Sequence, residues 1–512
     1  MITFSKENIL RHLERRPMLK ALLPFVVGIL LADGYALPVW GVAIGFVVCA
    51  VGAYLFRSSR AESLYLVGMV LTAGMMATTL RSLGEQIEPY EQIEVVIDDI
   101  TARRDDRIMG TAHVVAHQSE QGTRRTRVPI RFVADSMVGL AAGDRVVSTA
   151  RLGAFDNEQS YGRYMSRRGF VGQIALHPYN ITQHQHSAPT LAHRLREVAD
   201  EHIERLRLSD DAQRVAKAVA IGQRSEITPA IRENYTAAGA AHLLAVSGLH
   251  VGFVCVVINL LLWWLPLLSR GHLLRSAVVI CAIWLYASVA GFTPSVIRAA
   301  VMFTVMQAAI QLSSRSISAN TLCFTAVVML SWDARMIYDA GFLLSFLSVA
   351  AIIEWAVPLC TRLQRPNSGL LRQAAWWGAE WLRSAFVVSL VASIATAPLV
   401  AYLFGQFSLW GVVAGPMMVA LTAVAVGAVV VWVLLPIGVL QGVASEVIGS
   451  LIGTMNNIAA WCARAEVMSF EWQAEGWVCA GAYILFAFIT LTAWAIEKKI
   501  LNLPPERNTL HK

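Results

Sequence analysis

Charged side chains are scarce in this sequence. Asp, Glu, Lys and Arg together make up 15% of the 512 residues, whereas soluble domains carry nearer a quarter. Hydrophobic residues reach 56%, and the mean hydropathy is +0.53. This composition argues against an ordinary soluble domain and indicates a polytopic membrane protein.

Several signatures of chemistry are also missing. The seven cysteines have no Cys-x-x-Cys spacing, so they are interpreted as small core residues and not as disulfides or metal ligands. Without a phosphate-binding loop, the chain is not expected to drive transport with ATP itself. The His184-Gln185-His186 run, with His193, has no carboxylate or cysteine beside it, so no metal is expected there. The sequence predicts neither an enzyme nor a bound cofactor.

What the sequence has instead is long apolar blocks. Backbone groups in lipid must satisfy one another within a segment, so these blocks are predicted to be membrane helices. The first block is interpreted as an uncleaved span and not as a signal peptide, because more spans follow it almost at once. The blocks cover residues 19–32, 36–56, 64–80, 275–292, 317–332, 378–400, 409–435 and 477–496.

Basic residues orient the predicted spans. The N-terminus is basic and is placed in the cytoplasm, which puts residues 85–238 outside after three crossings. Nine further crossings, twelve in all, place linkers 333–338, 405–408 and 471–475 outside and return the C-terminus to the cytoplasm. The cytoplasmic linkers then hold Arg270, Arg275, Arg315, Arg362, Arg372, Lys498 and Lys499. The protein is therefore expected in the inner membrane, and its net charge of +7 is explained mainly by orientation.

The outer segment has a different pattern. Short β-branched runs at 93–100, 110–117, 126–134, 143–152 and 169–176 are separated by turn residues. They predict a small barrel or sandwich, with an OB-like fold as the leading candidate. Residues 191–208 form a charged amphipathic helix placed along the membrane face. The predicted organisation is 1–84 (three spans), 85–190 (outer OB-like domain), 191–238 (helical linker), 239–497 (membrane channel domain) and 498–512 (tail).

An unusual polar stretch opens the second membrane region. Residues 240–254 read AAHLLAVSGLHVGFV, which places His242, Ser247 and His250 among apolar residues. On one helix the two histidines would be about 12 Å apart, too far to share a metal. Gly248 between them favours a helix break or a close approach of another helix. Two interpretations remain open: a polar contact between helices, or a helix facing a water-filled path.

Three further segments favour the water-filled path. Residues 291–302 place Thr293 as a helix cap, Pro294 at the first helical position and Arg298 one turn later. An arginine within a span is costly, so it is expected to face a cavity, a partner or the headgroups. Residues 338–355 and 393–411 add further polar positions. On the predicted topology the following residues converge toward the outer side: His242, Arg298, Asp339, Ser345 and Gln406.

Four blocks together resemble the ComEC family of competence proteins: residues 222–253, 284–302, 338–352 and 395–411. The resemblance implies a channel that admits single-stranded DNA to the cytoplasm while the complementary strand is degraded outside. It also implies that the family's motif positions shape the conduit or contact DNA. Those positions in this sequence are Gly222, Arg224, His242, Ser247, Gly248, His250, Pro294, Ser295, Arg298, Gly341, Phe342, Ser345, Phe346, Pro398, Gln406 and Phe407.

In one respect the sequence departs from many family members. It contains no H-x-H-x-D-H motif of the metallo-β-lactamase-like domain that serves them as the proposed nuclease. Strand degradation is therefore expected of a separate nuclease. The resemblance also implies a periplasmic DNA receptor and a cytoplasmic helicase or motor as partners.

The outer domain offers clustered arginines for contact with DNA. Such clusters with stacking aromatic rings are typical of single-strand binders. Across 85–190, however, Arg and Lys total twelve while Asp and Glu total thirteen, so docking of a partner or of the bundle remains the alternative. The candidate contact residues are Arg103, Arg104, Arg107, Arg124, Arg125, Arg127, Arg131 and Phe132.

Two rival functions remain open on the sequence. One is transport of another anionic or amphiphilic substrate. The other is a membrane-embedded enzyme with His242 or His250 as general base, which is disfavoured because neither histidine has a carboxylate or nucleophile beside it.

Overall fold

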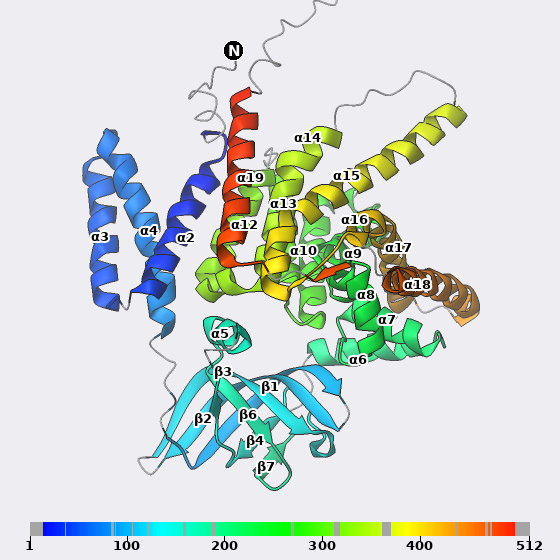
Figure 1. Ribbon diagram of the computed structural model, residues 1–512, viewed down its shortest axis with the longest axis horizontal. Coiled ribbons are helices and arrows are strands. Elements are labelled where there is room, and N and C mark those ends of the chain that lie inside the picture. The colour runs from blue at the N-terminus through cyan, green and yellow to red at the C-terminus, as the bar shows by residue number, and fades with distance from the viewer. Residues whose placement is uncertain are drawn as a thin grey trace, which may run out of the picture.

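The computed structural model describes residues 14–496 apart from 36, 83–86, 88, 105, 120–121, 157–159, 187–190, 268–270, 312–317, 361–369, 436–437, 466–468 and 472–473. A helical bundle sits above a curled sheet (Figure 1). The protein is thus mostly helical with one small β region, as the sequence predicts.

The helices of the first region are α2 (Pro17–Gly34), α3 (Val39–Leu55) and α4 (Arg60–Ser82). The connector after the sheet contains α6 (Leu191–Glu204), α7 (Asp210–Ile221), α8 (Pro229–Ala237) and η2 (Ala241–Leu244). The second bundle contains α9 (Gly248–Leu261), η3 (Leu265–Leu267), α10 (Gly271–Val289), α11 (Pro294–Gln311), α12 (Ser318–Trp332), η4 (Ala334–Tyr338), α13 (Ala340–Ala351), η5 (Ile352–Ala356), α14 (Val357–Cys360), α15 (Leu370–Phe404), α16 (Trp410–Val413), α17 (Gly415–Leu434), η6 (Gly438–Leu440), α18 (Gln441–Arg464) and α19 (Gly476–Ile496).

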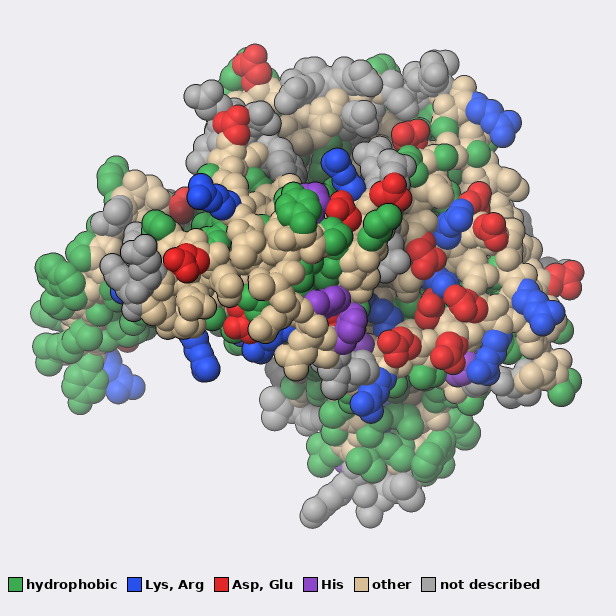
Figure 2. All heavy atoms as spheres, turned by 90° about the horizontal axis from the view of Figure 1, so that it is seen from below, with side chains coloured by type: hydrophobic (Ala, Val, Ile, Leu, Met, Phe, Trp, Pro, Cys, Tyr) green, Lys and Arg blue, Asp and Glu red, His purple; other side chains and the backbone are tan. Residues whose placement is uncertain are grey.

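Many of these helices have the length and composition of membrane spans. Eight are long and apolar enough to cross a bilayer, and the shorter apolar helices Val39–Leu55, Gly248–Leu261, Pro294–Ala308 and Ala319–Trp332 accompany them. Helix α3 presents its apolar side chains outward, with Trp40 and Tyr54 more than two-thirds exposed. Figure 2 shows hydrophobic side chains gathered at that end of the molecule. An exposed apolar face of this kind fits contact with lipid.

The sheet has more strands than predicted. Its order is β5-β6-β3-β2-β1-β4-β7, so β1 pairs with both β2 and β4, and β3 pairs in parallel with β6. All five predicted runs contribute, and two strands that the sequence analysis did not predict, β5 and β7, lie at the two ends. The strands are β1 (Gln92–Arg104), β2 (Arg107–Ser119), β3 (Gly122–Asp135), β4 (Arg145–Ser148), β5 (Gly153–Ala154), β6 (Gly172–Leu176) and β7 (Ile181–Gln185).

The alternation of β3 corrects one predicted DNA contact. Side chains along a strand point alternately to the two faces of its sheet. Val128, Ile130 and Phe132 occupy the inward face and are fully buried in the core of the sheet. Phe132 therefore has no free ring surface on which a base could stack, whereas Arg131 points to the other face.

Three contacts involve the linkers of the bundle. Arg168, which follows α5 (Ser160–Arg167), pairs with Asp339 at 2.9 Å, and β8 (Gln406–Ser408) pairs with β9 (Ser469–Glu471). Arg16 pairs with Glu354 and lies over the Trp494 ring. Of the three linkers predicted to lie outside, residues 333–338 thus adjoin Asp339, which holds the segment after α5, and residues 405–408 and 471–475 pair with each other.

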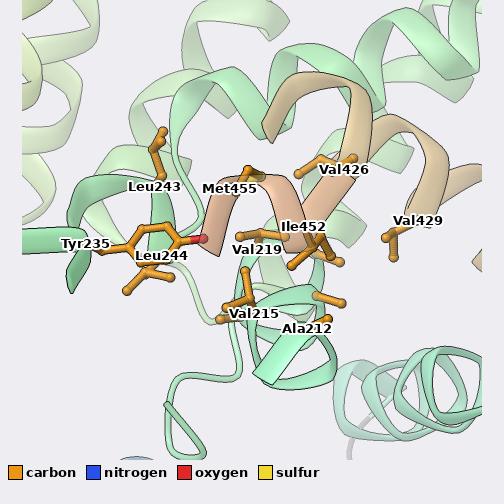
Figure 3. Packing of buried hydrophobic residues seen from close by; sticks show 14 of the residues in the cluster. Ala212, Val215, Val219, Tyr235, Leu243, Leu244, Val426, Val429, Ile452 and Met455 are labelled. Carbon is orange, nitrogen blue, oxygen red and sulfur yellow. The ribbon is translucent and has the colours of Figure 1, made fainter. Parts of the chain in front are cut away.

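The connector and the α17–α18 hairpin share one hydrophobic core. Val215 and Val219 of α7 pack with Val426, Ile452 and Met455 of that hairpin (Figure 3). This core explains why α7 is buried nearly all round.

The turn of this hairpin lies against the connector. Trp432 Nε1 donates to the His202 carbonyl at 2.7 Å and Ser445 Oγ to the Leu206 carbonyl at 2.6 Å. In Figure 1, α18 also runs crosswise to α3 and α19. The turn and α6 are therefore neighbours, whereas twelve alternating crossings would place the turn on the side of the membrane opposite residues 191–208.

Candidate functional site: an arginine-lined cavity

The polar stretch after the connector contains a break between two helices. The turn η2 ends at Leu244, and α9 begins at Gly248 with Ser247 as its N-cap. The Ser247 backbone N–H donates to His250 Nδ1 at 3.0 Å, and the Ser247 hydroxyl lies 2.8 Å from the same nitrogen. Because Nδ1 accepts a hydrogen bond, the ring proton is on Nε2. His250 thus closes the start of α9, which accounts for its presence in an apolar stretch.

Gly248 lets a second helix approach this break. A Cβ at Gly248 would lie 2.9 Å from Arg298 Nη2 and 3.4 Å from the Ala299 Cβ. The glycine thus makes room for the Arg298 guanidinium beside the first turn of α9. The predicted break and close approach at Gly248 are both confirmed.

Arg298 lies in the second turn of α11 and is 7% exposed. Its guanidinium carbon is 5.9 Å from the centroid of the Phe346 ring, and its Nε has no hydrogen-bond partner among the described residues. Among the described residues, no carboxylate forms an ion pair with it. A buried cation without a carboxylate partner is costly, so this position favours an anionic ligand.

Two other buried polar atoms also lack a hydrogen-bond partner among the described residues. Thr293 precedes α11 as predicted, but its Oγ1 is buried and makes no hydrogen bond within the described chain. His250 Nε2 is in the same state. Buried polar atoms are nearly always hydrogen-bonded in proteins. Three such atoms at the starts of α9 and α11 indicate a region built for water or a polar ligand.

Asp339 performs two structural tasks at the edge of this region. One carboxylate oxygen accepts the Phe342 backbone N–H at 2.8 Å, which caps α13. The other oxygen pairs with Arg168 at 2.9 Å. A Cβ at Gly169, whose φ is +87°, would collide with the Arg335 guanidinium. The segment after α5 is therefore fitted closely against η4 and joins the sheet to the bundle.

These elements enclose a cavity of about 1430 Å³ between the sheet and the bundle. Five arginines line it against two carboxylates, those of Asp99 and Asp339, which gives a lining charge of +5 − 2 = +3 with histidine neutral. The five come from β3, the end of α5, α6, the loop after α7, and α11. They are Arg131, Arg168, Arg196, Arg224 and Arg298.

The protein around the cavity lowers the pKa values of two basic groups in its lining, Arg196 and His242. Burial lowers the pKa of Arg196, and the nearby Asp99 carboxylate opposes this shift; the guanidinium still remains charged. Arg196 Nε also donates to the Val289 carbonyl at 2.8 Å, which fixes α6 to the end of α10. The surrounding protein lowers the pKa of the His242 imidazole, against a hydrogen bond with the Gly239 backbone. At neutral pH the cavity charge therefore comes from arginine.

The structure brings most of the predicted motif positions to this cavity. Four of the five residues predicted to converge are in its wall, and the Gln406 side chain lies outside the described part of the chain. The lining includes Gly222, Arg224, His242, Ser247, Gly248, Pro294, Ser295, Arg298, Asp339, Gly341 and Ser345.

The remaining motif positions lie behind the wall or in a neighbouring linker. His250 and Phe342 are buried, Phe346 supports Arg298, and Pro398 lies within the long helix α15. Gln406 and Phe407 form β8, and the Phe407 side chain also lies outside the described part.

The outer-domain arginines are divided in a different way. Among the predicted contacts whose side chains the structure describes, Arg131 lines the cavity. Arg107, Arg124, Arg125 and Arg127 are exposed near the hairpin turns of the sheet. Arg103 and Arg104 lie in β1, with side chains beyond the described part.

Sequence reasoning missed Asp99, Arg168 and Arg196 as cavity residues. The sequence analysis placed Arg196 within the amphipathic helix 191–208 but did not assign it to the path, and it made no prediction for Arg168. Their contacts depend on how sheet, connector and bundle pack together.

Comparison with known proteins shows a family match over the second half of the chain. The Competence protein family matches residues 219–496, more than half of the chain. ComE operon protein 3 of Bacillus subtilis (strain 168) is 28% identical over 212 residues, which cover 41% of this chain. That match spans a quarter of the relative's length. No solved structure matches the chain significantly.

Proposed function

Because the chain belongs to the Competence protein family, we propose that it is an inner-membrane channel through which single-stranded transforming DNA enters the cytoplasm. The cavity is the outer part of this path. His242, Ser247 and Arg298 line or shape it, with His250 fixing the helix start behind them. The chain itself catalyses no bond cleavage.

Arg298 is the observation that carries this proposal. A polyanion crossing a membrane needs a polar path, since phosphates cannot enter lipid. Arg298 supplies a buried positive charge that no described carboxylate neutralises. The lining charge of +3 extends the same preference across the cavity. Arginine also matches the oxygens of a phosphate with paired N–H donors.

The sheet is proposed to act as an OB-like module that passes DNA to the cavity. Arg131 belongs to both, because it projects from β3 and lines the cavity wall. The exposed arginines near the hairpin turns would make weaker, salt-sensitive contacts with the strand. A periplasmic DNA receptor is proposed to deliver the strand, a separate nuclease to degrade its complement, and a cytoplasmic helicase or motor to pull.

The proposed topology is the one predicted from the sequence, except for the α17–α18 hairpin. Both termini are placed in the cytoplasm, and the sheet with its connector is placed outside. Ten apolar helical segments are proposed to cross: α2, α3, α4, α9, α10, α11, α12, α13–α14, α15 and α19. The α17–α18 hairpin is instead proposed to lie along the outer leaflet against α6 and α7, where its contacts hold it.

The test follows labelled duplex DNA in a competent strain from which the gene has been deleted. We expect DNA to reach a DNase-resistant envelope compartment but not the cytoplasm. Wild-type protein should restore cytoplasmic entry, and Arg298→Glu should not, at equal membrane levels. Arg127→Glu on the exposed sheet serves as the matched control and should restore most of the entry.

Unchanged cytoplasmic entry after deletion would overturn the proposal. Transport of another anionic substrate would then become the leading function, because the same lining favours any anion. Competition by small anions in reconstituted protein would identify that case.

A further inference from the structure

Away from the cavity, one carboxylate and two imidazoles meet at the edge of the sheet. Asp144 Oδ2 lies 2.9 Å from His184 Nε2 and 3.0 Å from His186 Nδ1. All three ligand atoms lie within 4.8 Å of one another. The sequence analysis expected no carboxylate partner for the His184-Gln185-His186 run. That expectation was wrong, because the partner stands forty residues earlier in the chain.

Strand pairing explains how the three residues meet. β4 and β7 are antiparallel, with Val146 opposite His184 and Arg145 opposite Gln185. Alternate residues of a strand point to one face, so His184 and His186 lie on the face that Asp144 also occupies. The strand β7 is at the end of the sheet, which leaves His186 two-thirds exposed.

The carboxylate is held in place before any ligand arrives. Asp144 is 2% exposed. Its carboxylate accepts the Ala141 backbone N–H at 2.9 Å, and its own carbonyl accepts the Ile97 N–H at 2.9 Å. Among the described residues, its ion-pair partners are the two histidines and no lysine or arginine. A buried carboxylate facing two imidazoles is a suitable ligand set for a divalent cation.

We propose that Asp144, His184 and His186 bind a divalent, imidazole-preferring metal ion, with zinc as the first expectation. Ligand atoms around a tetrahedral zinc ion lie about 3.3 Å apart, given zinc–ligand distances of about 2.0–2.1 Å. The two carboxylate–imidazole separations of 2.9 and 3.0 Å are a few tenths of an ångström shorter than this, and the two imidazole nitrogens lie within 4.8 Å of each other. Three protein ligands leave one coordination position for water or an anionic oxygen.

Such an ion would join the last strand of the sheet to the start of β4. The strand β7 is otherwise held by its pairing with β4 over four register positions. Metal binding is thus expected to stabilise the edge of the outer domain and to place a positive charge there. This role is independent of the proposed DNA path, because no residue of the cluster lines the cavity.

The chain supplies its own matched controls. His177 Nδ1 lies 2.8 Å from Asp135, and His113 Nδ1 lies 2.7 Å from Asp98. Each is a single histidine–aspartate pair in the same sheet, with one imidazole fewer than the proposed site. Losing either histidine should therefore leave metal binding unchanged.

The experiment uses full-length protein in detergent, purified without a polyhistidine tag and dialysed first against a chelator. Zinc is then titrated, and bound metal is measured by mass spectrometry, with cobalt(II) absorption as a spectroscopic check on imidazole ligation. We expect about one zinc per chain from this site, with affinity reduced at least about tenfold in His186→Ala. His177→Ala should bind as wild type does.

His186 is the preferred position because its side chain is largely exposed, so its loss should not disturb folding. His184→Ala provides the second variant. Zinc binding that is equal in wild type, His186→Ala and His184→Ala would overturn the proposal, as would wild-type protein that binds no zinc at micromolar concentration. Apparent melting temperature should rise with zinc in wild type and stay constant in His186→Ala.

Discussion

Two sets of arginines in this protein differ in what surrounds them. Arg124, Arg125 and Arg127 lie on the exposed end of the sheet, where water and salt screen their charge. Arg298 lies in the cavity wall on α11, with 7% of its surface exposed and no carboxylate partner among the described residues. The exposed arginines keep their hydration, so they cost the folded protein little free energy and give little information about ligands. Burial removes the hydration of Arg298, and this desolvation penalty is the reason to expect an anion beside it.

The largest predicted difference between the two sets is the effect on DNA entry of neutralising one arginine of each. Arg298→Gln is expected to reduce cytoplasmic DNA entry at least about tenfold, since a buried contact to a charged group contributes about 1.5–3 kcal/mol. Arg127→Gln should cost less than about fivefold, and its effect should fade as salt rises. Uptake of labelled DNA by complemented deletion strains, at equal membrane levels, measures both. Equal effects of the two substitutions would remove the distinction between the sets.

The second prediction concerns the backbone of the cavity wall. Gly239 has φ +66°, and a Cβ there would lie 2.7 Å from the Gly411 Cα. Gly239→Ala combines left-handed strain with a backbone clash, so it should destabilise the fold by about 2–4 kcal/mol. Urea unfolding in detergent, followed by tryptophan fluorescence, measures this change.

Gly427→Ala is the matched control, because a Cβ at that α17 position meets nothing within 4 Å. Alanine is a better helix former than glycine, so this change should be neutral or stabilise by up to about 1 kcal/mol. If Gly239→Ala unfolded at the same urea concentration as wild type, the backbone at Gly239 and Gly411 would have moved to admit the new Cβ. The cavity wall would then be less rigid than their close approach indicates.

The smallest predicted effect is on pH dependence. The folded state lowers the pKa of His242 below its usual value, so below about pH 6.5 the unfolded chain binds a proton that the folded chain resists. The stabilising effect of this neutral histidine is therefore present above that pH and lost as pH falls. His242→Gln should flatten the acid side of the stability profile, by an apparent melting-temperature change on the order of a degree. An identical acid slope in both proteins would contradict this prediction.

The same contrast separates what could be predicted from the sequence from what could not. The long apolar helices, the break at Gly248 and the position of Arg298 beside a cavity each depend on local composition or on one helix, and the structure contains all three. Asp144 was not predicted to join His184, because their pairing requires β4 and β7 to be neighbours. Nothing within either segment indicates that neighbour.

Phe132 shows a signal that was present and not used. Residues 128–134 read VPIRFVA, and strict alternation places Phe132 on the same face as Val128 and Ile130. Counting positions along that strand would have assigned the ring to the core and Arg131 to the other face. The assignment of Arg168 and Arg196 to the cavity, by contrast, depends on how three separate regions pack, which no single segment encodes.

The α17–α18 hairpin has a consequence for counting compartments. A hairpin contributes two crossings or none, so on the proposed topology the number of crossings is even in either case and the two ends of the chain share one compartment. Reporter fusions at the termini would therefore give the same answer for ten and for twelve crossings. The 438–440 turn distinguishes them: a cysteine placed at Gly438 would react with an impermeant thiol reagent from the periplasm if the hairpin lies along the outer leaflet, and from the cytoplasm if it crosses.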